Sequence, residues 1–100
     1  MASIADLVEE PALKQLATQD VYAQGVTLAA NGSVHFVKAG PIGVTAHVDD
    51  AESYTVELLR TNDDTLSWSC TCQEAQNGTF CKHCVATGIE TWLQAPPRRK

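Results

Sequence analysis

The sequence predicts an α+β fold, in which a small antiparallel β-sheet follows N-terminal helices and precedes a C-terminal helix. Three observations predict this order. Apolar residues recur at helical spacing over the first thirty residues and again from Val85. Between Ser33 and Cys72 they alternate with polar residues, which is typical of strands with one covered face. All four cysteines lie between Cys70 and Cys84, where the last strand would join the last helix.

The length of the chain sets the scale of this fold. One hundred residues fit one small domain, and a bound metal is a natural supplement to so small a hydrophobic core. We divide the chain into an N-terminal helical segment packed on the sheet (residues 1–32), the sheet with its metal-binding finger (residues 33–95, finger proper about 68–93) and a basic tail or linker (residues 96–100).

The N-terminal segment is expected to hold two short helices. Ser3 and Asp20 are candidate N-caps, because their side-chain oxygens can accept hydrogen bonds from the free N–H groups of a first turn. Pro11 interrupts the first helix or begins the next. Asn31 and Gly32 are expected to end the second helix with a left-handed cap.

Four short strands are expected after Ser33, separated by polar turns, and helical spacing then returns until Pro96 stops the last helix. The acidic stretches at residues 49–52 and 62–64 are read as turns. The alternating stretches that we assign to strands are residues 34–37, 44–48, 54–58 and 66–72.

The cysteine cluster predicts a site for one structural zinc ion. Two close pairs (Cys70 and Cys72, Cys81 and Cys84), with His83 inside the second, supply the sulfur and imidazole donors that tetrahedral zinc prefers. In an ideal strand the Cα atoms of Cys70 and Cys72 lie ~6.7 Å apart, whereas two sulfurs on one zinc lie ~3.7 Å apart. The strand is therefore expected to bend at this pair. The alternatives are a disulfide or buried free thiols.

The spacing leaves the fourth ligand open. If Cys81 lies inside the last helix, Cys84 follows about 60° away and His83 points nearly opposite, which predicts four cysteine ligands. If the helix begins only at about Cys81 or Lys82, Cys81 lies in the incoming turn and His83 can turn toward the metal. Periodicity does not decide between the two.

The finger resembles a known family. Cys70-x-Cys72, a short loop and Cys81-x-His83 are similar to the SWIM zinc finger, whose pattern is Cys-x-Cys, a variable spacer and Cys-x-His. The resemblance implies Cys70, Cys72, Cys81 and His83 as zinc ligands and leaves Cys84 over. It also implies DNA binding or protein–protein interaction, often beside helicase or transposase domains.

Upstream of the finger the resemblance is to bacterial members and reaches back to about residue 20. Tyr22-x-x-Gly25 and the strands as far as Val56 resemble the segments that precede their finger. The chain departs from them at Gln24, where arginine is usual, and at residues 49–50, where two aspartates replace a glycine-containing turn. These departures count against a phosphate-facing role for the upstream segment.

Charge favours a protein partner. The net charge is −5, from twelve acidic and seven basic residues, and the last three residues are basic. A body of this sign repels phosphate unless its cations are clustered. The alternative is a nucleic-acid-binding finger that uses Lys82, Arg60 and the tail of Arg98, Arg99 and Lys100. Pro96 and Pro97 make the tail resemble an interdomain linker, so we expect a module of a larger protein or assembly.

Other classes of function are not indicated. Catalysis by zinc would need an open coordination position and a nearby base, and Glu74 is the only carboxylate inside the loop. Cys81 and Cys84 form a Cys-x-x-Cys pair, which keeps a thiol oxidoreductase as the alternative, but we expect no enzyme and no small-molecule substrate. His35 and His47 are expected at the surface of strands. Without a signal peptide or an apolar run of about 20 residues, we expect a cytoplasmic protein and no membrane partner.

Overall fold

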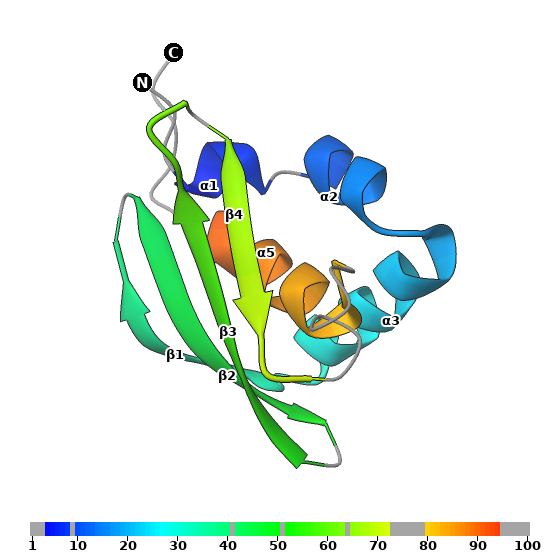
Figure 1. Ribbon diagram of the computed structural model, residues 1–100. Coiled ribbons are helices and arrows are strands. Elements are labelled where there is room, and N and C mark those ends of the chain that lie inside the picture. Colours follow the sequence, from blue (N-terminus) through cyan, green and yellow to red (C-terminus); the bar gives the residue numbers. More distant parts are fainter. Residues whose placement is uncertain are drawn as a thin grey trace.

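The fold consists of one sheet with helices packed on one of its faces, as the computed structural model shows (Figure 1). The structure describes residues 4–8, 10–40, 42–50, 52–63, 65–72 and 80–94. The predicted α+β class is confirmed. In chain order, the helices and strands are α1 (Ile4–Leu7), α2 (Glu10–Leu16), α3 (Gln19–Ala30), β1 (Val34–Ala39), β2 (Gly43–Asp50), β3 (Glu52–Arg60), β4 (Leu66–Cys70) and α5 (Lys82–Gln94).

The sheet is antiparallel with strand order β1-β2-β3-β4, so each strand pairs with its neighbour in sequence. Alternate residues of the strands point to the helical side, where they pack against α5 and α1. The other face is exposed and mostly polar. The buried residues of the inner face are Val44, Ala46, Val48, Val56, Leu58 and Cys70.

Strands β2 and β3 are longer than the alternating pattern predicts, and β4 is shorter. β2 continues to Asp50 and β3 begins at Glu52, which pairs with Asp50 in register, so the residues read as an acidic turn belong largely to strands. The prediction that the fourth strand reaches residue 72 is wrong, because β4 ends at Cys70 and Cys72 lies in a bend. That bend at the cysteine pair is the one that zinc geometry requires.

The described residues of the N-terminal segment form three helices, whereas two are predicted. Thr18, not Asp20, caps α3, because its hydroxyl oxygen accepts a hydrogen bond from the N–H of Val21 at 3.2 Å. Asp20 lies within the first turn, where its charge is favourable. Pro11 lies in the first turn of α2, a position that needs no N–H donor. The candidate cap Ser3 lies outside the described residues.

The predicted left-handed cap at the end of α3 is confirmed. Gly32 has φ of +71°. Its N–H donates to the carbonyl of Ala29 at 3.1 Å, and that of Ser33 donates to Leu28 at 3.1 Å. This pair of bonds is the Schellman arrangement, which satisfies carbonyls at a helix end and turns the chain into β1.

Helices α3 and α5 cross in close contact at Gly25. A Cβ atom at this position would lie 2.3 Å from Cγ1 and 2.5 Å from Cβ of Val85. Only glycine therefore permits this approach, which gives a packing reason for the glycine in the Tyr22-x-x-Gly25 pattern. Further along α5, Gly88 faces Leu13 and Val8, so the N-terminal helices and α5 share one core. None of the described helices is long and apolar enough to cross a membrane.

We predict that Gly25→Ala destabilises the zinc-loaded protein by about 1–3 kcal/mol, because the added methyl group overpacks the contact with Val85. At an open helical position the same change would be stabilising, since alanine favours helix. Urea unfolding measures the difference. The matched control is Gln24→Ala on the exposed side of α3, which should stay within about 0.5 kcal/mol of the parent. Equal stability of the two variants would contradict the packing argument.

Candidate metal centre

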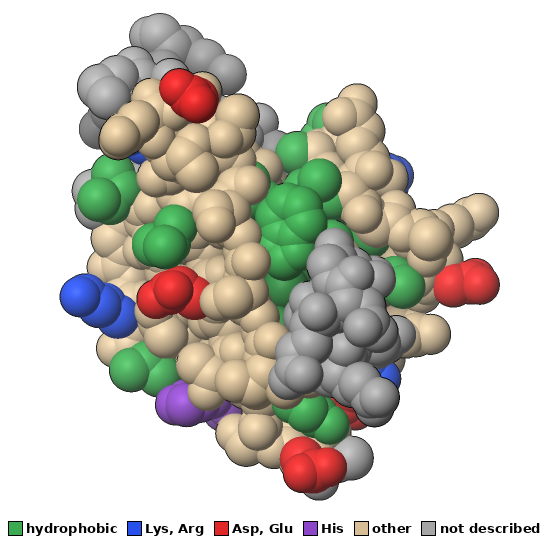
Figure 2. Space-filling view, viewed as in Figure 1, with side chains coloured by type: hydrophobic (Ala, Val, Ile, Leu, Met, Phe, Trp, Pro, Cys, Tyr) green, Lys and Arg blue, Asp and Glu red, His purple; other side chains and the backbone are tan. Residues whose placement is uncertain are grey.

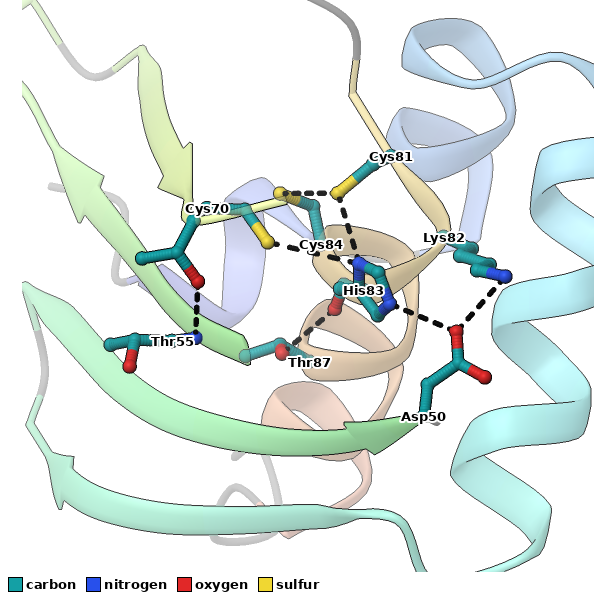
Figure 3. Close-up of polar contacts among 9 residues, drawn as sticks. Asp50, Thr55, Cys70, Cys81, Lys82, His83, Cys84 and Thr87 are labelled. Atoms are coloured by element: carbon teal, nitrogen blue, oxygen red, sulfur yellow. Dashed lines mark hydrogen bonds and ion pairs between the residues drawn. The ribbon is translucent and has the colours of Figure 1, made fainter. Parts of the chain in front are cut away.

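The structure brings together the four residues of the predicted site. Cys70 is the last residue of β4, Cys72 follows in the bend, Cys81 directly precedes α5, and His83 lies in its first turn. Their ligand atoms all lie within 4.8 Å of one another, and all four residues are buried. Figure 3 shows Cys70, Cys81 and His83 converging from the strand end and the helix start.

The Cys-x-Cys corner is held by the residue between the two cysteines. The N–H of Thr71 donates to the carbonyl of Thr55 at 3.1 Å, and the N–H of Thr55 donates to Oγ1 of Thr71 at 3.0 Å. These bonds hold Thr71 against β3 beyond the end of β4. One of them goes to the side chain of Thr71 and not to its carbonyl, and the backbone bends away from the strand at residues 71 and 72. The side chains of Cys70 and Cys72 can therefore approach the same point, which a straight strand would prevent.

The start of α5 matches the later of the two helix starts that the spacing leaves open. The helix begins at Lys82, and the carbonyl of Cys81 accepts a hydrogen bond from the N–H of Val85 at 3.0 Å. Cys81 thus directly precedes the helix, at the positive end of the helix dipole, where a thiolate is favoured. Since the helix begins this late, His83 reaches the cluster.

The distances fit a tetrahedral zinc ion. Nδ1 of His83 lies 3.7 Å from Sγ of Cys81 and 3.8 Å from Sγ of Cys70. Around zinc, with bonds of about 2.3 Å to sulfur and 2.0–2.1 Å to nitrogen, sulfur and nitrogen ligands lie about 3.6 Å apart. Three thiolates and one imidazole are also donors of the right softness. The group is positioned to bind one zinc ion with a filled coordination shell.

Cys84 places a further sulfur donor beside the group. Its Sγ lies 3.7 Å from Sγ of Cys81, and the residue is fully buried in the core. The convergent group contains His83 and not Cys84. The ligand set Cys70, Cys72, Cys81 and His83 stays a prediction, and the close position of Cys84 makes it the residue to compare with His83.

The pKa values of the clustered thiols shift in opposite directions. Contacts with the thiols of Cys70 and Cys84 lower the pKa of Cys81, against the effect of burial and with help from His83. The same contact with Cys81 raises the pKa of Cys70 to about 12. The pKa of Cys84 is raised by Cys70, Cys81 and burial. Zinc binds cysteine as the thiolate, so binding at this cluster is expected to release protons.

A carboxylate that the sequence analysis did not include among the site residues adjoins the cluster. Oδ2 of Asp50, the last residue of β2, lies 3.1 Å from Nε2 of His83 and 2.9 Å from Nζ of Lys82. The hydrogen bond from Lys82 lowers the pKa of Asp50, burial opposes this, and His83 lowers it further. Burial by itself would lower the pKa of His83, but contacts with Cys81 and Asp50 outweigh it and raise the pKa.

Other residues considered in the sequence analysis lie away from this cluster. Arg60 is the last residue of β3, whereas the cysteines gather at the other end of the β3–β4 pair. His35 and His47 are exposed strand residues, as predicted, although His35 does gain an acidic neighbour in Asp49 at 3.2 Å. Among the described residues, no second group could hold a metal. Glu74 and the tail from Arg98 to Lys100 lie outside the described residues.

A comparison with protein families identifies the site. Residues 54–87 match the family model of the SWIM zinc finger. The chain contains a SWIM zinc finger. The match begins in β3 at Tyr54 and ends in α5 at Thr87, so it includes all four residues of the convergent group. Comparisons with curated proteins and with solved structures gave no match. The SWIM zinc finger here combines the family pattern with a Cys3His group placed for one zinc ion.

We predict that Cys84→Ala keeps one zinc ion per chain at nearly unchanged affinity, whereas His83→Ala weakens zinc binding by more than about 100-fold. The reason is that loss of a ligand costs more than loss of a residue that merely supports one, for which 10–100-fold is usual. Metal analysis and competition with a chromophoric chelator measure both quantities. Loss of zinc from Cys84→Ala with retention in His83→Ala would establish a four-cysteine site instead.

Proposed function

We propose that this SWIM zinc finger is a structural module that binds a protein partner, as part of a larger protein or assembly. The observation that carries the proposal is the ion pair between Lys82, a cation within the finger, and Asp50. Lys82 is bound by the carboxylate of Asp50 at 2.9 Å, with both side chains less than a third exposed. A lysine held in this way is poorly placed to meet a phosphate.

Arg60, the other cation that a nucleic-acid-binding finger would use, lies far from Lys82. Lys82 contacts the end of β2, where Asp50 pairs with Glu52 at the beginning of β3. Arg60 is at the opposite end of β3, a strand of nine residues whose ends lie about 27 Å apart. The two cations therefore do not form the cluster that an acidic chain would need to hold a nucleic acid.

The exposed face of the sheet offers a surface that suits a protein. Figure 2 shows apolar, acidic, basic and histidine side chains interspersed on this side of the molecule. Val37, Ile42 and Leu59 are 60%, 56% and 41% exposed, and they belong to β1, the β1–β2 connection and β3. Apolar side chains surrounded by polar ones are the usual composition of a protein-binding surface.

The zinc ion is proposed to be structural and the domain non-catalytic. Four protein donors fill a tetrahedral shell, so no position remains for a substrate or an activated water. The four cysteines have free thiols. Thiols kept free for metal binding are typical of a reducing compartment, and this supports a cytoplasmic location in the proposal.

The test compares protein capture with nucleic-acid binding. The zinc-loaded chain is immobilised and exposed to nuclease-treated extract of its own source, and in parallel it is titrated with labelled duplex and single strands at low salt. We expect one protein to be retained in a fixed ratio, with retention reduced at least tenfold by Leu59→Asp or by removal of zinc. Thr27→Asp, on the exposed side of α3, is the control that should retain it.

Nucleic-acid binding would contradict the proposal if it had the properties of a specific site. These are tight binding at low salt, a steep loss of affinity with added salt, and weakening by Lys82→Ala. Leu59→Asp would then leave the affinity unchanged.

A further inference from the structure

We propose that Asp50 is the positioning residue of the zinc site: its carboxylate fixes His83 so that Nδ1, and not Nε2, faces the three thiolates. Asp50 lies at the end of β2, 33 residues before His83 in the chain. It reaches the ring only because β2 and the start of α5 meet in the fold (Figure 3). The inference concerns the metal site and does not depend on the partner proposed above.

The two ring nitrogens of His83 have different partners. Oδ2 of Asp50 lies 3.1 Å from Nε2, and a carboxylate only accepts hydrogen bonds, so Nε2 must hold a proton. In the neutral ring Nδ1 then carries the lone pair. That atom is the one that lies 3.7 and 3.8 Å from the sulfurs of Cys81 and Cys70. The tautomer of the His83 ring and the direction in which its Nδ1 points therefore both suit metal binding.

Two further contacts keep this arrangement in place. Nζ of Lys82 donates to the same carboxylate oxygen at 2.9 Å, which holds the carboxylate beside the ring. The ring of Tyr54 stacks on that of His83, with centroids 4.3 Å apart and planes inclined by 29°. Asp50 thus restrains the ring at its edge and Tyr54 restrains its face, while His83 itself is almost fully buried.

The position of Asp50 also links the ligand to the sheet. Cys70 already ties the end of β4 to the site, and Asp50 ties the end of β2 to the same helical turn. A histidine held from both sides loses little further freedom when it binds the metal. The carboxylate also increases the basicity of the ring, which strengthens its bond to a cation.

The first test reads the tautomer in the unaltered, zinc-loaded protein by ¹⁵N NMR of the His83 ring. We expect metal-bound Nδ1 and a protonated Nε2 whose proton exchanges slowly with water, because Asp50 accepts it. Metal bound at Nε2 would overturn the proposal, whatever the variants show.

The second test compares zinc affinity, by chelator competition, across matched variants. We expect Asp50→Ala to weaken zinc binding by about 10–100-fold and to make the Nε2 proton exchange rapidly. Asp49→Ala, its exposed neighbour on the opposite face, should change neither quantity. Lys82→Ala removes the contact that holds the carboxylate but keeps Asp50 itself, so it should weaken zinc binding less than Asp50→Ala does. Asp50→Asn serves if Asp50→Ala does not fold; its amide oxygen can still accept the Nε2 proton but lacks the charge, so a smaller loss of zinc affinity is expected. Affinity and proton exchange equal to those of Asp49→Ala would overturn the proposal.

Discussion

The convergence of three thiols and one imidazole at the junction of β4 and α5 is the constraint on which the rest of the domain depends. Three thiolates this close would repel one another without a cation between them. Hydrophobic packing alone would not direct the ring nitrogen of His83 toward the sulfurs. A structural zinc site contributes on the order of 10 kcal/mol, which is comparable to the whole stability of a small domain. Metal binding and folding are therefore expected to be one event.

The first turn of α5 is fixed from several directions at once. Cys81 and His83 face the metal group, and Asp50 holds Lys82 and His83 from the end of β2. Beyond that turn, Gly25 lets α3 lie directly against Val85. The hydrophobic core and the metal site consequently share helix α5. A substitution that destabilises the packing of α5 is therefore expected to weaken the metal site as well, and the reverse.

Local spacing explains what the sequence could predict and what it could not. The bend after Cys70 follows from ligand geometry, and the order of elements follows from periodicity, because both depend on neighbouring residues. The choice between His83 and Cys84 depends on where the last helix begins, which periodicity does not fix, so only the family resemblance favours His83. The contact of Asp50 with His83 does not follow from local spacing, because the two residues lie 33 positions apart in the chain. Thr18 rather than Asp20 caps α3 because a cap is set by where the backbone turns extended, not by residue type alone.

Whether one zinc ion ties the end of β4 to the start of α5 is tested most directly by thermal unfolding of the reduced protein with and without a strong chelator. Circular dichroism should show a cooperative transition for the zinc-loaded chain. After chelation this transition should be lost or fall to a much lower temperature, and returning zinc should restore it. A metal-free, reduced protein that unfolds cooperatively at the same temperature would contradict the account.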